Sequence, residues 1–539
     1  MISRFRLVFR QYTLVQKAIL VGLLLWGVAL TGTFFSTQPQ VGLYYDNQNT
    51  YFVQGLRLSG QVPYLNADWF AQTKPLHIAF TYLVAGLARL HILPQAVAFL
   101  DVAFRLVFLF SLFLIVFALC RFAEPDLPDV PATRLRRTVF SLSIITIYLL
   151  SLWPVYQLSA ISERLGVTSV AIALEKFGFY YSFGGFAAFR YYTEPAAFTV
   201  LIFTALALLP YRRWRWSAAL LGFSALMHAS FLIHTGIIAG LLVVYLFFWE
   251  NRKQAYAVFL IYAALVLPMV LYVLIGMTDA FTGEATRLLA WERLRHHTWP
   301  VYWWDATDSV HAGVVLVAVT LLVWKGQGVL RWLIPVIAAY VGLGIAVVYW
   351  TGDLNLAIQI PWRASGYLYA VAQLVFLAGG LFGIVKVLSR WPKAAMLLVV
   401  LVPLILLGWG VVEHGLFTLL EVEYRDITTQ EAYPLMRAIQ TETEPEALLL
   451  TPLDAGDYRL GAQRPVVVDW KSHPYLGAEV LEWWDRVQFV RSFYQLDGPA
   501  RQQACRQVGA DYYVLEAATR SETEPAFLER GEWVLVPCP

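Results

Sequence analysis

The chain has 539 residues, of which 59% are hydrophobic and 14% are charged, with a formal net charge of +3. Its mean hydropathy of +0.58 excludes a soluble globular protein, and several apolar runs approach the roughly 20 residues that a helix needs to cross a bilayer. With only three cysteines, the sequence also excludes a disulfide-rich scaffold and a cysteine-rich metal cluster.

Eleven apolar segments are predicted to cross the membrane. Their residue ranges are 18–35, 98–119, 138–157, 195–210, 217–232, 235–249, 255–276, 311–324, 332–350, 366–385 and 394–412. If the N-terminus is inside, the short inside connections hold clusters of Lys and Arg, and the positive-inside rule then places the C-terminus outside. The fold class that follows is a membrane all-α bundle of about 11 transmembrane helices with a small C-terminal α/β domain.

Two segments determine this number of spans. The run Leu76–Leu90 is interpreted as a helix within the first outside loop, residues 36–97, because a crossing here would put the basic cluster after the second span outside. The run Ser217–Phe248 has basic residues at both ends, so we interpret it as two short helices that meet at a polar tip, His228–His234. Broken helices of this kind often border a substrate cavity.

Residues 413–539 are predicted to form a soluble domain outside the cytoplasm, after a membrane domain of residues 1–412. They hold 21 acidic and 11 basic residues, a net −10, whereas the remainder holds 16 acidic and 29 basic residues, a net +13. An α/β layer is indicated by the β-rich runs Ala447–Thr451, Pro465–Asp469, Asp511–Leu515 and Glu532–Val536 and by the helix Ala500–Val508. Cys505 and Cys538 can pair if this domain lies in an oxidising compartment.

The stretch Gly42–His77 puts carboxylates, amides, aromatic rings and a Lys-Pro pair beside the membrane, where polar groups are typical of functional sites. Asp46 lies shortly after the first span, between Tyr45 and Asn47. A carboxylate in this position suits a general base. The alternative is a solvated aspartate or a helix N-cap, because a helical-looking run, Gln48–Leu58, follows it.

The residues YYDNQNTYFVQGLRLSGQVPY and WFAQTKPLH resemble the first outside loop of the GT-C superfamily of polyprenyl-phosphate-sugar glycosyltransferases, in particular the lipid A aminoarabinose transferases and protein mannosyltransferases. The likeness comprises the acid Asp46, a helix that ends at Ser59-Gly60, and Lys74-Pro75-Leu76-His77. The resemblance implies a bundle of spans with a soluble outside domain. It also implies that Asp46 deprotonates the acceptor and that Lys74 faces the phosphate of a lipid donor.

The sequence departs from the family pattern at two positions. Asn47 stands where many members have a second acid, and Leu76 stands where the family has a second proline. Asn47 removes the acidic pair that would hold a metal ion. No metal ligand is therefore assigned, and the need for a divalent metal stays open.

Two arginines outside this loop are candidate phosphate ligands, because a guanidinium fork matches phosphate oxygens. Arg190 lies in the second outside loop, and Arg363 is the only basic residue of its own loop, where anchoring at the membrane surface is the alternative. Glu194 precedes Pro195 at the start of a span and either lines the site or complements the helix dipole. The possible site-lining residues are Tyr45, Asn47, Gln48, His77, Glu194 and His228.

Together these residues predict a glycosyltransferase at the outer face of the plasma membrane. Its expected partners are a polyprenyl-phosphate sugar donor, a glycan, lipid or protein acceptor, and the bilayer, with no nucleic acid. No G-x-x-x-x-G-K-[ST] motif occurs, so ATP-driven transport has no support. Two alternatives remain: a ligase or polymerase of lipid-linked glycans, and a non-enzymatic flippase or transporter of lipid-linked sugars.

Overall fold

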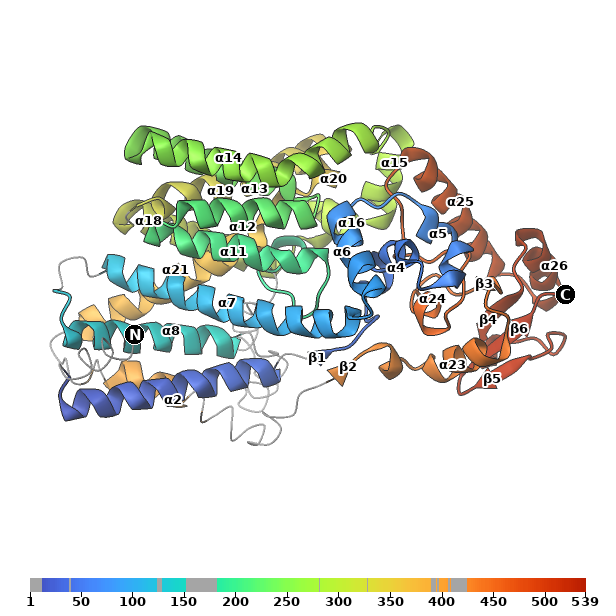
Figure 1. Cartoon of the computed structure of the whole chain (residues 1–539), viewed down its shortest axis with the longest axis horizontal. Helices are drawn as coiled ribbons and strands as arrows, with labels where there is room; N and C mark the ends of the chain where they lie inside the picture. The colour runs from blue at the N-terminus through green and yellow to red at the C-terminus, as the bar shows by residue number, and fades with distance from the viewer. Residues whose placement is uncertain are drawn as a thin grey trace.

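A computed structural model of the chain describes residues 12–37, 40–123, 128–151, 182–280, 282–326, 328–388, 394, 397–405, 408 and 424–539. Long helices run side by side through one part of the molecule, and residues 424–539, the C-terminal unit, lie at one end of them (Figure 1). Short helices of the predicted first outside loop lie between the bundle and the C-terminal unit (Figure 1). The site described below is built where these three parts meet.

The bundle consists of long, predominantly apolar helices. They are α2 (Leu14–Thr37), α7 (Leu93–Ala123), α8 (Pro131–Ser151), α11 (Thr199–Leu208), α12 (Trp214–Met227), α13 (Phe231–Tyr245), α14 (Arg252–Leu271), α18 (Ala306–Lys325), α19 (Leu330–Thr351) and α21 (Ser365–Val387). Short 3₁₀ or π turns extend α11, α13, α14 and α21: η3 (Pro195–Phe198), η4 (Leu209–Tyr211), η5 (Leu246–Glu250), η6 (Tyr272–Gly276) and η8 (Pro361–Ala364).

The chain is a multi-pass membrane protein. Within the described residues, seven helical stretches are long and apolar enough to cross a membrane: Leu14–Phe35, Leu93–Phe122, Phe231–Glu250, Arg252–Gly276, Ala306–Lys325, Leu330–Thr351 and Leu354–Val387. Parts of the predicted spans 138–157 and 394–412 fall outside the described residues. Eleven spans and the N-in, C-out orientation therefore stay predictions.

The two unusual segments fold as the sequence predicts. The run Leu76–Leu90 forms α6 (Ile78–Arg89), whose 12 residues reach only roughly 18 Å and do not match the thickness of a bilayer. The run Ser217–Phe248 is broken between α12 and α13, where His228 has an extended backbone with φ −137° and ψ 108°. At this break the N–H of Ala229 donates to a side chain, that of His77, and not to a carbonyl of the preceding helix.

The predicted outside loops contain short helices instead of irregular chain. These are α3 (Gln48–Tyr51), α4 (Val53–Ser59), η1 (Pro63–Asn66), α5 (Trp69–Gln72), η2 (Phe183–Gly185), α15 (Gly283–Arg287), the π-helix η7 (Leu288–Arg293), α16 (Arg295–Thr298), α17 (Pro300–Trp303) and α20 (Leu354–Gln359). Gly55 lets α4 lie directly on α6, because a Cβ atom there would be 2.7 Å from the carbonyl oxygen of Thr81. This close packing fixes α3 and α4 over the end of the bundle.

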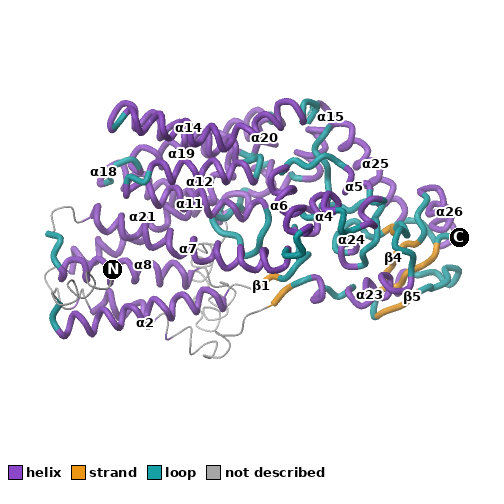
Figure 2. The backbone as a smooth tube through the Cα atoms, viewed as in Figure 1, coloured by secondary structure: helices purple, strands orange, loops and turns teal. Residues whose placement is uncertain are grey.

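The C-terminal unit has a four-stranded sheet with helices on its faces. The strands β3 (Leu449–Leu450), β4 (Tyr512–Glu516), β6 (Trp533–Pro537) and β5 (Leu528–Arg530) are adjacent in that order, and only the β3–β4 pair is parallel. The helices are η10 (Ile427–Thr429), α23 (Tyr433–Glu442), α24 (Tyr458–Gly461), α25 (Gly477–Phe493), α26 (Gly498–Val508) and η11 (Ala517–Thr519). Outside this sheet, β1 (Gln40–Val41), which follows α2, pairs with β2 (Tyr424–Arg425) at the start of the C-terminal unit (Figure 2).

Three of the four predicted strands and the helix before Gly509 are present in the C-terminal unit, but the run Pro465–Asp469 is not a regular strand. It makes one isolated bridge, between Val466 and Leu449. Pro465 has no N–H to donate, and the N–H of Val466 donates to the Asp68 carboxylate at 3.0 Å instead of to a neighbouring strand. The structure also pairs Cys505 with Cys538 in a disulfide.

The segment that carries Arg190 is seated on α21 at Gly366. A Cβ atom at Gly366 would lie 2.8 Å from the backbone carbon of Ala187. We expect Gly366→Ala to push this segment off the helix and to destabilise the protein by about 1–3 kcal/mol, as overpacking does. The measurement is the thermal unfolding midpoint of the detergent-purified protein.

Gly380 offers a matched control on the same helix, because a Cβ atom there meets no atom within 4 Å. Gly380→Ala should leave the midpoint unchanged or raise it slightly, since Ala is the better helix former. Equal midpoints for the two variants would contradict the close contact at Gly366.

Candidate functional site

A cavity of about 710 Å³ lies where the bundle, the short loop helices and the C-terminal unit meet. One wall is apolar and comes largely from the bundle and its connections, with Phe231, Ile233, Val273, Ile358 and Ile360 among its members. Four basic side chains and one acidic side chain also line it: Arg190, Arg293, Arg363, Lys471 and Glu194. An apolar wall beside an excess of positive charge suits a ligand with a hydrocarbon chain and an anionic group.

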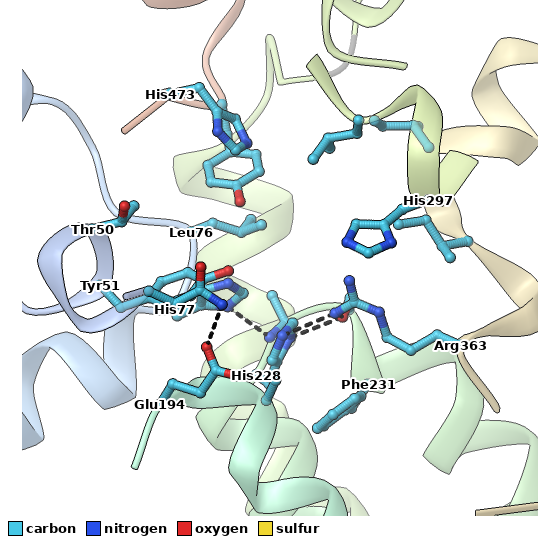
Figure 3. A pocket seen from close by; sticks show the side chains of 18 of the residues that line it. Thr50, Tyr51, Leu76, His77, Glu194, His228, Phe231, His297, Arg363 and His473 are labelled. Atoms are coloured by element: carbon cyan, nitrogen blue, oxygen red, sulfur yellow. Dashed lines mark hydrogen bonds between the residues drawn. The ribbon is translucent and has the colours of Figure 1, made fainter. Parts of the chain in front are cut away.

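Arg363 binds the break between α12 and α13. Its Nη1 lies 2.9 Å from Nε2 of His228 and 2.7 Å from the hydroxyl of Ser230, and its guanidinium group lies 5.0 Å from the ring centre of Phe186. Arg363 and His228 point toward each other in Figure 3. Neither of these two hydrogen bonds goes to an acid, so the charge of Arg363 is available to a ligand. Ile360, with a positive φ of 49°, makes the turn that presents Arg363, a conformation that β-branched residues rarely adopt.

His77 lies against the same break. Its Nδ1 accepts a hydrogen bond from the N–H of Ala229 at 3.2 Å, and its ring centre lies 4.2 Å from that of His228. Burial, and then the charge of Arg363, lower the pKa of His77 to about 3. His77 is therefore neutral at physiological pH, and arginine and lysine supply the positive charge of the cavity.

Glu194 is the buried acid of the cavity. It precedes Pro195 and the turn η3 with an extended backbone, and its side chain is 1% exposed. Its carboxylate accepts a hydrogen bond from the Asn47 amide at 3.0 Å and lies 3.6 Å from Nε of Arg190. Burial raises the pKa of Glu194, and Arg190 and the Asn47 hydrogen bond oppose that rise. Glu194 thus holds two of the predicted site residues in place.

Asp46 lies beside this group but is not among the residues that line the cavity. Tyr44 and Asp46 both have positive φ, 66° and 48°, which is uncommon outside glycine and is typical of strained functional segments. The turn directs the Asp46 carboxylate to the hydroxyl of Tyr192, at 2.9 Å, and to the ammonium group of Lys471. The side chain is 37% exposed, so a substrate hydroxyl can reach it.

The C-terminal unit contributes residues that the sequence did not assign to the site. Trp470, Lys471, His473 and Tyr475 line the cavity, and Figure 3 shows His473 on the far side of it from Glu194. These four side chains lie in one segment, residues 470–475. Its mixture of Trp, Lys, His and Tyr after a short extended run is the signal that was available. Nothing in the sequence indicates that this segment lies against Asp46.

Arg459 fixes this segment against the short loop helices. Its guanidinium group is 1% exposed and donates to Asp68 at 2.7 Å, to Asp469 at 2.5 Å and to Ser472 at 2.9 Å. Asp68 also caps α5 by accepting from the N–H of Ala71. Two carboxylates from distant parts of the chain thus share one arginine, and the segment that begins at Trp470 follows directly after Asp469.

The remaining predicted residues lie around the cavity without lining it. The hydroxyl of Tyr45 accepts from Arg425 at 3.3 Å, and the amide of Gln48 accepts from the N–H of Tyr44 and donates to the carbonyl of Thr193. The ammonium group of Lys74, predicted to face the donor phosphate, donates to the carbonyl of Gly276. A role for Lys74 in phosphate binding stays a prediction of the sequence alone.

Within the described part of the chain, no group of three or more His, Cys, Asp or Glu side chains is arranged to hold a metal ion. Nδ1 of His77 accepts from a backbone N–H, and the two ring nitrogens of His228 contact Arg363 and Ser230.

Comparison with known proteins gives three findings. A family model described as a domain of unknown function, DUF6798, matches residues 430–490. No curated protein matches the chain. Solved structures do match, at low identity.

The structural matches include ArnT from Cupriavidus metallidurans in two states. With ArnT bound to undecaprenyl phosphate the TM-score is 0.41 at 12% identity, and with apo ArnT it is 0.38 at 11% identity; each match covers 96% of this chain and 97% of ArnT. An apo oligosaccharyltransferase from Archaeoglobus fulgidus matches with a TM-score of 0.32 and 12% identity, covering 70% of this chain and 59% of that one. Because these scores are low, the function is inferred below from the residues of the cavity.

Arg459 makes a sharp test of how the C-terminal unit is held. Arg459→Met leaves the Asp68 and Asp469 carboxylates buried without their partner, and breaking a buried ion pair in this way costs about 3–5 kcal/mol. We expect a large fall in the thermal unfolding midpoint and a faster reaction of Lys471, whose side chain is already 45% exposed, with amine-modifying reagents.

The exposed pair of Arg134 with Asp129, whose side chains are 51% and 67% exposed, provides the control. Exposed pairs contribute little to stability, so Arg134→Met should not change the midpoint. A normal midpoint together with unchanged Lys471 reactivity in Arg459→Met would show that the buried network does not hold the segment.

Acid should destabilise the site through its buried histidines. The pKa of His473 is lowered to about 3, first by burial and then by Arg293, and the pKa of His297 is also lowered to about 3 by burial. Between the ordinary pKa of 6.5 and about pH 3, the unfolded chain binds protons that the folded chain does not. The free energy of unfolding must then fall as pH falls through this range.

We expect His473→Asn to reduce the slope of the unfolding midpoint against pH below 6.5. His91 is exposed on the connection after α6, so His91→Asn should leave the slope unchanged. A slope in His473→Asn equal to that of the unmodified protein would exclude His473 as an acid-sensitive group.

Proposed function

We propose that the protein transfers a sugar from a polyprenyl-phosphate donor to an acceptor hydroxyl in this cavity. The observation that carries the proposal is the composition of the cavity wall, in which Arg190, Arg363 and Lys471 face a single acid and an apolar surface. A polyprenyl phosphate has the matching parts, a hydrocarbon chain and an anionic head. The resemblance of the residues around Asp46 to GT-C glycosyltransferases supports the same reaction.

The donor phosphate would be bound by Arg363 and Arg190. The two hydrogen bonds of Arg363 go to His228 and Ser230 and leave its positive charge without an acid. In the transfer, the bond between the anomeric carbon and the phosphate oxygen breaks, and the phosphate leaves with the electron pair. Guanidinium groups that are already in place stabilise the charge that develops there.

Asp46 would act as the general base. The acceptor oxygen attacks the anomeric carbon from the side opposite the phosphate, with inversion, and its proton passes to the Asp46 carboxylate. The hydroxyl of Tyr192 donates to the second oxygen of this carboxylate and orients it. Lys471 must give way or turn toward the substrate as the acceptor arrives, since its ammonium group binds Asp46 directly.

We further propose that the cavity and the C-terminal unit lie on the outer side of the plasma membrane. The disulfide between Cys505 and Cys538 supports this side, because cytosolic proteins rarely keep disulfides. The clusters of Lys and Arg at the other connections support it as well. The acceptor, whether glycan, lipid or protein, would then enter from the aqueous side.

The decisive experiment is transfer from a panel of radiolabelled polyprenyl-phosphate sugars by the purified protein and by Asp46→Asn. We expect the variant to lose transfer by a factor of about 100–10,000, the usual contribution of general-base catalysis, while its unfolding midpoint stays normal. Asp485 is exposed on α25, so Asp485→Asn should keep full activity.

Normal turnover by Asp46→Asn would end the assignment of Asp46 as the base. If no donor is turned over but the lipids move between leaflets in reconstituted vesicles, the protein is a flippase and the proposed transfer is wrong.

A further inference from the structure

A second guanidinium group in the cavity makes no direct ion pair with an acid in the described part of the chain. Arg293 ends the π-helix η7 and lines the cavity near the C-terminal unit. Among the described residues it makes no hydrogen bond or ion pair, its Nε is buried without a hydrogen-bond partner, and Asp469 is the acid among its electrostatic neighbours. Its guanidinium group lies 5.8 Å from the ring centre of Trp470. A buried cation without an acid is costly unless a ligand supplies the opposite charge.

Arg293 and Arg363 occupy different parts of the cavity. Arg363 is bound to the break between α12 and α13, whereas Arg293 lies beside Trp470 of the C-terminal unit. Tyr51 and Tyr475 are electrostatic neighbours of both guanidinium groups. The two arginines thus flank a shared middle region, where the reacting sugar would lie.

His473 adds a hydrogen-bond acceptor next to Arg293. Its Nδ1 lies 2.9 Å from the carbonyl oxygen of Lys471, so Nδ1 carries the proton and donates it there. The other nitrogen, Nε2, is then an acceptor, and it is buried without a hydrogen-bond partner among the described residues. This part of the cavity therefore offers one positive charge, one acceptor for a hydroxyl hydrogen, and the aromatic faces of Trp470 and Tyr475.

We propose that Arg293 and His473 form a second anion subsite, which binds a carboxylate or phosphate on an acceptor sugar. The inference rests on the proposed function, in which Arg363 holds the donor phosphate. An anionic sugar has each feature that the subsite requires: a negative group for Arg293, a neighbouring hydroxyl for Nε2 of His473, and an apolar ring face for the aromatic side chains. The acceptor class is then an anionic saccharide or glycolipid, not a neutral glycan.

The other source of a second anion is the donor itself, if its sugar is linked through a diphosphate. In that case the same lipid would occupy both arginines. We assign the second anion to the acceptor, because Arg293 lies beside Trp470 of the C-terminal unit and not at the break between α12 and α13 that holds Arg363.

The test uses the full-length protein saturated with undecaprenyl phosphate and titrated with glucuronate or glucose in a calorimeter. These two sugars share one ring and differ at the carboxylate. We expect glucuronate to bind at least about tenfold more tightly than glucose, a difference that one charge-assisted hydrogen bond supplies. Arg293→Gln should remove this preference and leave the affinity for undecaprenyl phosphate unchanged. His473→Phe should weaken the binding of both sugars, because it removes the hydrogen-bond acceptor Nε2 and keeps an aromatic ring.

Arg363→Gln is the reciprocal variant. It should weaken the binding of undecaprenyl phosphate and keep the preference for glucuronate over glucose. Arg506 is exposed on α26, so Arg506→Gln should change neither the affinity for undecaprenyl phosphate nor the preference for glucuronate. Equal binding of glucuronate and glucose, or competition of glucuronate with undecaprenyl phosphate, would overturn the second subsite. Displacement of glucuronate by undecaprenyl diphosphate, but not by the monophosphate, would overturn the acceptor assignment. Failure of undecaprenyl phosphate to bind at all would instead contradict the proposed function.

Discussion

The ion pairs of Arg459 with Asp68 and Asp469 hold together the two parts of the chain on which the cavity depends. Arg459 and Asp68 are 391 residues apart, yet both side chains are almost fully buried. A charged group out of water requires opposite charge in good geometry, so these residues accept few alternative arrangements. The network places the segment from Trp470 to Tyr475 over the end of the bundle, and it thereby closes the cavity opposite Arg363.

The charge within the cavity follows from the same burial. Its histidines are kept neutral, as the lowered pKa values of His77 and His473 indicate, so the positive charge comes from side chains that do not lose it near neutral pH. Arg363 and Arg293 form no ion pair with an acid among the described residues, and Glu194 is occupied by Asn47 and Arg190. Such an excess of buried positive charge is stabilised when an anion enters, which relates the fold directly to the class of ligand proposed.

Local patterns in the sequence predicted much of the fold. The length and apolar character of the runs predicted the long helices, and basic residues at both ends of Ser217–Phe248 predicted the break that the structure has at residues 228–230. The prediction of a strand at Pro465–Asp469 is wrong because a tertiary contact competes with strand pairing: the N–H of Val466 donates to Asp68. The helices α23 and α25 are not predicted from the sequence: α23 has only 10 residues, and α25 has 17 residues but no clear amphipathic pattern.

The candidate site was likewise predicted only in part from the sequence. Polar residues beside apolar spans are locally unusual, so the sequence by itself singled out Asn47, His77, Arg190, Glu194, His228 and Arg363, and the structure brings all six into the wall of one cavity. Lys471, His473 and Arg293 are ordinary residues in their own segments, and only the tertiary structure decided that they face the same space. The physical reason is that a local pattern records burial and secondary structure, whereas a buried ion pair such as Arg459 with Asp68 joins segments that share no pattern.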